Sequence, residues 1–221
     1  VMAELPLPFS DKKETWTWTT DIKDYTAEIE QAGQEAWTAF FGHIQDSLNR
    51  DDAPEAIRAL EHALPKFVKK GSSAYDAAVS SVIEAFNAYG AAKNDAADID
   101  ILEGALAVYN KVLEFDPENV DALEGIRVLS ASISDLYVDR GVATEEKGGI
   151  DAFKSAAADY ERALFWNEDN DAAEARLAGV KVKIAEHYYQ EGVKLEETEG
   201  IGAKDRIVAL YEKAQEWVAG Y

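Results

Sequence analysis

The sequence predicts an all-α protein built from helix-turn-helix units that recur every 51 residues. Two observations predict this class: residues of matching type repeat at one fixed interval, and each interval contains two amphipathic helical segments. The residues that keep the interval are Phe86, Tyr137 and Tyr188; Gly90, Gly141 and Gly192; Ile99, Ile150 and Ile201; Tyr109, Tyr160 and Tyr211; and Phe115, Trp166 and Trp217. Five columns in one register indicate an internal repeat.

The first helix of each unit carries apolar residues three and four positions apart. In the unit that begins near residue 120, the helix is expected over 120–141, with an apolar stripe on one face. The residues of this stripe are Leu123, Ile126, Leu129, Ile133, Leu136 and Tyr137. Turns rich in glycine and charge are predicted over 91–98, 142–149 and 193–200, where they should break the helix and face solvent.

The second helices are predicted over 99–115, 150–166 and 202–218. Small residues recur where two helices must approach closely, in the column of Ala105 and Ala156 and at Ala163. Asn119 and Asn170 stand before the following first helices and suit the N-cap position, because an asparagine side chain accepts hydrogen bonds from free backbone N–H groups.

A fainter first unit precedes these three. Trp37 and Ile44 lie on its expected first helix, and Ala56 and Leu60 resemble the later second helices. Prolines and the alternation of threonine and tryptophan before residue 20 suit an extended segment. We therefore expect an extended N-terminal arm over 1–26 and a helical repeat domain over 27–221, with units at about 27–70, 71–118, 119–169 and 170–221.

The repeat columns resemble the tetratricopeptide family. Its second helix has an alanine, an aromatic residue, another small residue and a following proline, matched here by Ala105, Tyr109, Val112 and Pro117. The family unit has about 34 residues, so this chain differs by its longer first helices and inter-helix turns, and the early Trp and Leu-Gly signature of the family has no match. The resemblance implies a right-handed α-solenoid of about four tetratricopeptide-like repeats.

The same resemblance implies a function. In tetratricopeptide-like proteins the concave face, lined by first helices, receives an extended peptide or a partner's helix. Long-helix variants resemble extracytoplasmic bacterial scaffold and transport-associated proteins, which favours a periplasmic or extracytoplasmic location over a cytoplasmic one. We therefore expect a non-enzymatic protein-binding scaffold or adaptor.

Charge and composition restrict the partners. There are 22 Lys and Arg against 43 Asp and Glu, giving a net charge of −21 that repels nucleic acids and anionic membrane surfaces. No cysteine is present, and no apolar run is long enough to span a membrane. No catalytic motif, cofactor or metal site is expected. A basic or apolar segment of a partner protein fits this surface best.

The expected partner-binding residues lie away from the stripe that packs on the paired helix, together with the last aromatic column. They are Arg127, Ser134, Val138, Lys181, Ala185, Tyr189 and Trp217. The small residues among them equally suit contacts between neighbouring first helices. Trp217 lies on a final second helix without a polar helix after it, which predicts docking onto a partner or a second copy.

Two alternatives stay open. In the first alternative, the chain is a small-ligand-binding or transport-associated extracytoplasmic subunit, and an unfilled apolar pocket at Trp37, Phe40 or Tyr89 would mark it. The second alternative is a structural subunit of a larger complex, which predicts a homo-oligomer or a poorly behaved isolated chain.

Overall fold

The computed structural model describes residues 19–219, with side chains described from residue 28 onward except at Glu30. All regular structure in this part of the chain is helical, which confirms the predicted all-α class. The elements are α1 (Thr19–Asn49), α2 (Ala53–Phe67), α3 (Ser73–Ala92), α4 (Ile99–Phe115), α5 (Val120–Glu145), α6 (Ile150–Trp166), α7 (Asp171–Glu199), the 3-10 helix η1 (Gly200–Ala203) and α8 (Lys204–Trp217).

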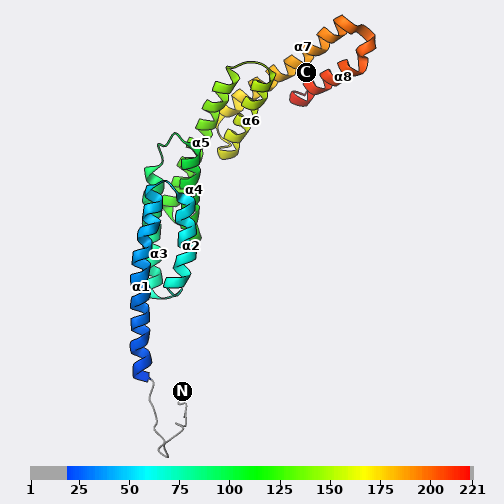
Figure 1. Ribbon diagram of the computed structural model, residues 1–221. Helices are drawn as coiled ribbons and strands as arrows, with labels where there is room; N and C mark the ends of the chain where they lie inside the picture. Colours follow the sequence, from blue (N-terminus) through cyan, green and yellow to red (C-terminus); the bar gives the residue numbers. More distant parts are fainter. Residues whose placement is uncertain (1–18, 220–221) are drawn as a thin grey trace, which may run out of the picture. The chain divides into compact units, whose positions relative to one another are not determined.

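The chain forms two compact units, of which the first ends at Phe86 and the second begins at Asn87. In the first unit α1 packs along α2 (Figure 1). Asp52 caps α2 by accepting a hydrogen bond from the backbone N–H of Glu55. A side chain at Gly33 would overlap the carbonyl oxygen of Phe67, so glycine at this position lets α1 approach the end of α2 closely.

In the second unit, helices that follow one another in the chain pack against one another. The pairs α4 and α5, α5 and α6, α6 and α7, and α7 and α8 are all in contact, as Figure 1 shows for α5 with α6 and α7 with α8. The first helix α5 also touches the next first helix, α7. Each helix pair therefore buries its apolar faces within the pair and against the neighbouring pair.

The glycine and tyrosine columns meet in space within each pair. The contacting residues are Gly90 with Tyr109, Gly141 with Tyr160, and Gly192 with Tyr211. A Cβ atom placed on any of these glycines would lie less than 3.0 Å from an atom of the tyrosine ring. The ring therefore packs directly on the backbone of the first helix, and two columns that the sequence shows separately are one contact.

Asparagine caps join successive first helices. Asn119 and Asn170 each accept a hydrogen bond from the backbone N–H three residues later, as predicted for N-cap residues. Each also reaches the preceding first helix: Asn87 Nδ2 donates to Asn119 Oδ1 at 3.1 Å, and Asn170 Nδ2 donates to Ser134 Oγ at 2.8 Å. One asparagine side chain thus caps the start of a helix and fixes that helix against the preceding first helix.

Helix bounds agree with the predicted second helices, because α4 and α6 cover 99–115 and 150–166 and α8 begins two residues later than expected. The predicted turns over 142–149 and 193–200 are wrong in their first residues. There α5 continues to Glu145 and α7 to Glu199, because neither segment contains a helix-breaking residue before Gly148 or Gly200, both of which have positive φ.

The predicted arm also ends earlier than expected. Helix α1 begins at Thr19, so residues 19–26 belong to the helix, and the rest of the predicted arm lies outside the described residues. No proline follows Pro8 before Pro54, and Ile22, Tyr25 and Ile29 continue the spacing of an amphipathic helix. The alternation of threonine and tryptophan therefore does not extend the arm as far as residue 26.

The close contact of Gly141 with Tyr160 predicts the effect of an added methyl group. Gly141→Ala should lower the free energy of unfolding by about 1–3 kcal/mol, because the fully buried Tyr160 ring has to shift. Gly179→Ala is the matched control, since nothing lies within 4 Å of its Cβ and alanine favours the helix by about 1 kcal/mol. Urea unfolding of both variants measures the difference. Equal stability of the two variants would contradict the contact.

Candidate partner-binding surface

The structure places the expected binding residues in different environments. Arg127 is exposed on α5 and donates two hydrogen bonds to Glu124, at 2.9 and 2.6 Å. Lys181 on α7 is half-buried and pairs with Glu161 at 3.4 Å. Tyr189 is 41% exposed, and its ring centre lies 5.5 Å from that of Tyr211. Of these three, Tyr189 is the exposed aromatic residue.

Two of the expected binding residues are fully buried. Ser134 donates to the carbonyl oxygen of Ala163 at 2.8 Å and accepts from Asn170, so it joins α5, α6 and the cap of α7. Ala185 has no exposed surface either. Both therefore serve contacts between helices, which is the other role that the sequence left open for small residues at these positions.

Val138 and Trp217 flank one buried cluster. Its fully or nearly fully buried members come from α6 and α7: Ala156, Ala157, Tyr160, Val180 and Ile184. Val138 from α5 and Trp217 from α8 pack against it and are themselves half-buried. Trp217 therefore faces the preceding helices, and other residues form the uncovered part of the α7–α8 pair.

Exposure in one repeat column identifies that uncovered part. Leu106 on α4 is 9% exposed and Ala157 on α6 is 2% exposed. Val208, 51 residues after Ala157, is 43% exposed on α8. The first helix of the following pair covers this position in α6, and no helix among residues 87–219 covers it in α8.

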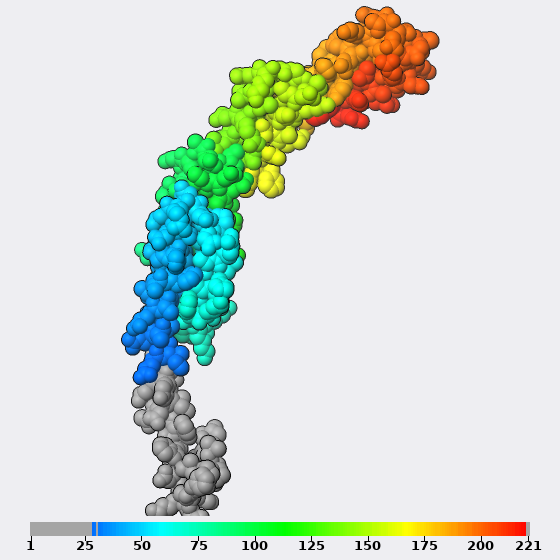
Figure 2. All heavy atoms as spheres, in the orientation of Figure 1, coloured from blue at the N-terminus to red at the C-terminus, as the bar shows by residue number. Residues whose placement is uncertain are grey.

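Neighbouring columns show the same change. Tyr160 is fully buried while Tyr211 is half-buried, and Val138 is half-buried while Tyr189 is exposed. Ile150 packs against the buried cluster, whereas Ile201 is 93% exposed. We call Tyr189, Ile201, Val208 and Tyr211 the α7–α8 open face. Figure 2 shows α7 and α8, in orange and red, in close contact with each other.

On the α5–α6 pair, α7 covers the surface that corresponds to the α7–α8 open face, and the carboxylate of Glu145 lies at the edge of that surface. Glu145, at the end of α5, accepts hydrogen bonds from Tyr160 Oη at 2.6 Å and from Lys183 Nζ at 2.7 Å. Arg176 lies 3.8 Å from the same carboxylate, whose side chain is 11% exposed. Both basic residues belong to α7, so these ion pairs hold α7 against the side of the α5–α6 pair that it covers.

The pKa values of this cluster follow from its contacts. Burial acts to raise the pKa of Glu145, but the hydrogen bonds from Lys183 and Tyr160 and the nearby positive charges outweigh it and lower the pKa. Burial, followed by donation to the negative carboxylate, raises the pKa of Tyr160 well above its usual value. Glu145 is therefore held as a carboxylate and Tyr160 as a neutral phenol at neutral pH.

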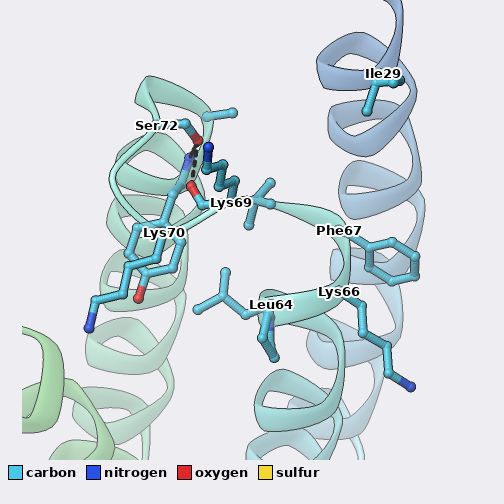
Figure 3. A pocket seen from close by; sticks show the side chains of 11 residues that line it. Ile29, Leu64, Lys66, Phe67, Lys69, Lys70 and Ser72 are labelled. Carbon is cyan, nitrogen blue, oxygen red and sulfur yellow. Dashed lines mark hydrogen bonds between the residues drawn. The ribbon is translucent and has the colours of Figure 1, made fainter. Parts of the chain in front are cut away.

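A separate hollow lies in the first unit. A cavity of about 580 Å³ opens between the end of α2 and the start of α3, with Leu64 and Val68 buried in its wall. Figure 3 shows Lys66 and Lys70 extending to opposite sides of this hollow. Trp37, Phe40 and Tyr89, where the sequence placed a possible apolar pocket, do not line it, and Trp37 and Tyr89 are buried by their neighbours.

None of the acidic or histidine side chains of the described residues gather in a group of three that could hold a metal ion. None of their helices combines the length and the hydropathy that a membrane span requires.

A comparison with models of known protein families gives no match, and a search of curated protein sequences finds no match either. The resemblance to tetratricopeptide repeats therefore rests on the repeat columns described above.

The lowered pKa of Glu145 gives a pH prediction. Its contribution to stability is present above the unfolded-state pKa of about 4.3 and is lost as the pH falls through the lower folded-state value. Glu145→Gln should cost about 1–2 kcal/mol at neutral pH, because Lys183 loses its charged partner. Urea unfolding across the acidic range should show the variant and the native chain converging. A constant difference would contradict this assignment.

Proposed function

We propose that this protein is a non-enzymatic interaction scaffold of tetratricopeptide-like repeats, arranged as a right-handed α-solenoid, that binds a helical segment of a partner protein. The observation that supports the proposal most directly is the rise in exposure from 9% at Leu106 and 2% at Ala157 to 43% at Val208. A position that the repeat otherwise covers with a helix is left apolar and accessible on the α7–α8 open face.

The residues of this face suit protein binding. Ile201 and Val208 supply aliphatic surface, and Tyr189 supplies an aromatic ring with a polar end, the kind of side chain enriched in interfaces. Burying apolar area contributes roughly 25 cal/mol per Å², so a helix that covered these side chains would gain a useful part of its binding free energy here. The face replaces the broader set of first-helix residues as the favoured surface.

Site-specific cross-linking tests the proposal. A photoreactive phenylalanine analogue at Val208 should cross-link to a partner protein in the native cells, because this position lies within the face. The same analogue at Phe165, which is 81% exposed on α6, is the matched control and should not trap that protein. Tyr189→Glu should abolish the cross-link from position 208.

The mass of the cross-linked product separates the remaining interpretations. A heterologous protein trapped at 208 and absent at 165 supports the scaffold. A product of twice the chain mass would instead support a homo-oligomer or a structural subunit of a larger assembly. Cross-linking that is equal at 208 and 165, or absent at both, would overturn the assignment of this face.

The cavity in the first unit favours a second candidate function, the binding of a small ligand. Its volume of about 580 Å³ lies in the range of small-molecule sites. Apolar side chains from α2 and Tyr75 of α3 line it together with Lys69 and Lys70. A ligand with an apolar body and an acidic group fits this lining.

Anilinonaphthalene sulfonate, an apolar aromatic anion, is a suitable probe for this candidate. It should fluoresce on binding the native chain, and Ala74→Trp should reduce the signal by filling the cavity. Val208→Glu removes apolar area from the α7–α8 open face and is the matched control, which should retain the signal. Loss of fluorescence with the control alone would mean that the probe reports the open face.

A further inference from the structure

The ion pair around Glu145 predicts the charge of the partner segment. Its two basic neighbours, Arg176 and Lys183, both come from α7, the helix that covers the α5–α6 pair. On the same helix, Val180 and Ile184 fill the buried cluster and Leu177 packs at its edge. As the covering helix, α7 therefore brings an apolar stripe together with a positive charge directed at Glu145.

The α7–α8 pair carries the counterpart of this acceptor. Glu196 follows Glu145 by 51 residues, and it accepts a hydrogen bond from Tyr211 Oη at 3.2 Å, as Glu145 does from Tyr160. Glu196 is exposed, and none of the ion pairs among residues 28–219 includes it. The carboxylate and its tyrosine are thus in place, while the basic partner that α7 supplies to Glu145 has no equivalent among the described residues.

We infer that the partner segment is a basic amphipathic helix that covers the α7–α8 open face in the way that α7 covers the α5–α6 pair, with a lysine or arginine that pairs with Glu196. The inference rests on the proposed function and adds the chemistry of its partner. The apolar residues of this helix occupy the spacing of Leu177, Val180 and Ile184, and the basic residue stands one position before the last of them, as Lys183 does.

Charge and geometry both favour such a helix. The chain has a net charge of −21, so a basic segment is attracted to it before contact is made. At the covered position Lys183 Nζ lies 2.7 Å from the Glu145 carboxylate. The same Nζ lies 5.5 Å from the ring centre of Phe153, which is a cation–π contact. The residue 51 positions after Phe153 is Lys204, so the α7–α8 pair does not repeat the ring contact. Glu196 remains as the specific acceptor for the basic residue of the partner.

A synthetic peptide with the sequence of residues 170–190, in which Asp171, Glu174 and Glu186 are replaced by glutamine, is the probe. This segment already has the apolar stripe and Lys183, and the replacements make the peptide basic. Labelled peptide should bind the full chain in a fluorescence anisotropy titration. Val208→Asp should abolish binding by placing a charge in the apolar face. Glu196→Lys should weaken binding about tenfold, which corresponds to loss of roughly 1.4 kcal/mol. A second peptide with glutamate in place of Lys183 should bind the Glu196→Lys variant more tightly than it binds the native chain.

The variants distinguish the inference from the function on which it rests. Binding that is lost with Val208→Asp but unchanged by Glu196→Lys would leave the open face in place and overturn the basic partner. Binding that is unaffected by Val208→Asp, or no binding of the peptide to the native chain, would overturn the open face itself. Circular dichroism of each variant confirms that the helices are intact.

Discussion

The packing of a tyrosine ring on the backbone of a glycine is the constraint on which the helix pairs depend. The ring of Tyr160 is fully buried, and it lies where any side chain at Gly141 would stand. The hydroxyl of this ring then determines where Glu145 can accept a hydrogen bond, and Glu145 in turn receives Lys183 from α7. One close contact within a pair thus positions the polar group that holds the following pair.

The glycine–tyrosine contact recurs in the three pairs, and the α5–α6 pair has one side that is completed only when a first helix covers it. For α5 and α6 that helix is α7, whose cap Asn170 also bonds to Ser134. For α7 and α8 the described residues provide no such helix. The exposed area at Ile201 and Val208 is therefore a consequence of the repeat itself. The same geometry that stabilises the α5–α6 pair leaves an apolar, accessible face on the α7–α8 pair.

Periodicity in the sequence predicted the helices, their pairing and the capping role of Asn119 and Asn170, because each depends on local spacing or on a fixed interval. It did not predict which small residues are buried. Ser134 and Ala185 share a column with each other but lie between helices, and only tertiary packing decides this. The glutamate column of Glu145 and Glu196 was visible in the sequence, yet its meaning requires knowing that the tyrosine hydroxyl reaches it.

The apolar character of the side chain at the uncovered position argues that its exposure has a function. Its counterparts in the column, Leu106 and Ala157, are apolar and at most 9% exposed, and α7 packs over Ala157. At the open position the chain carries Val208, which exposes more apolar surface than alanine would. A polar residue there would improve solubility without loss of internal packing. An apolar side chain at this position, one helical turn before the Tyr211 that donates to Glu196, is instead what a surface requires to receive a helix with an apolar stripe and a basic group.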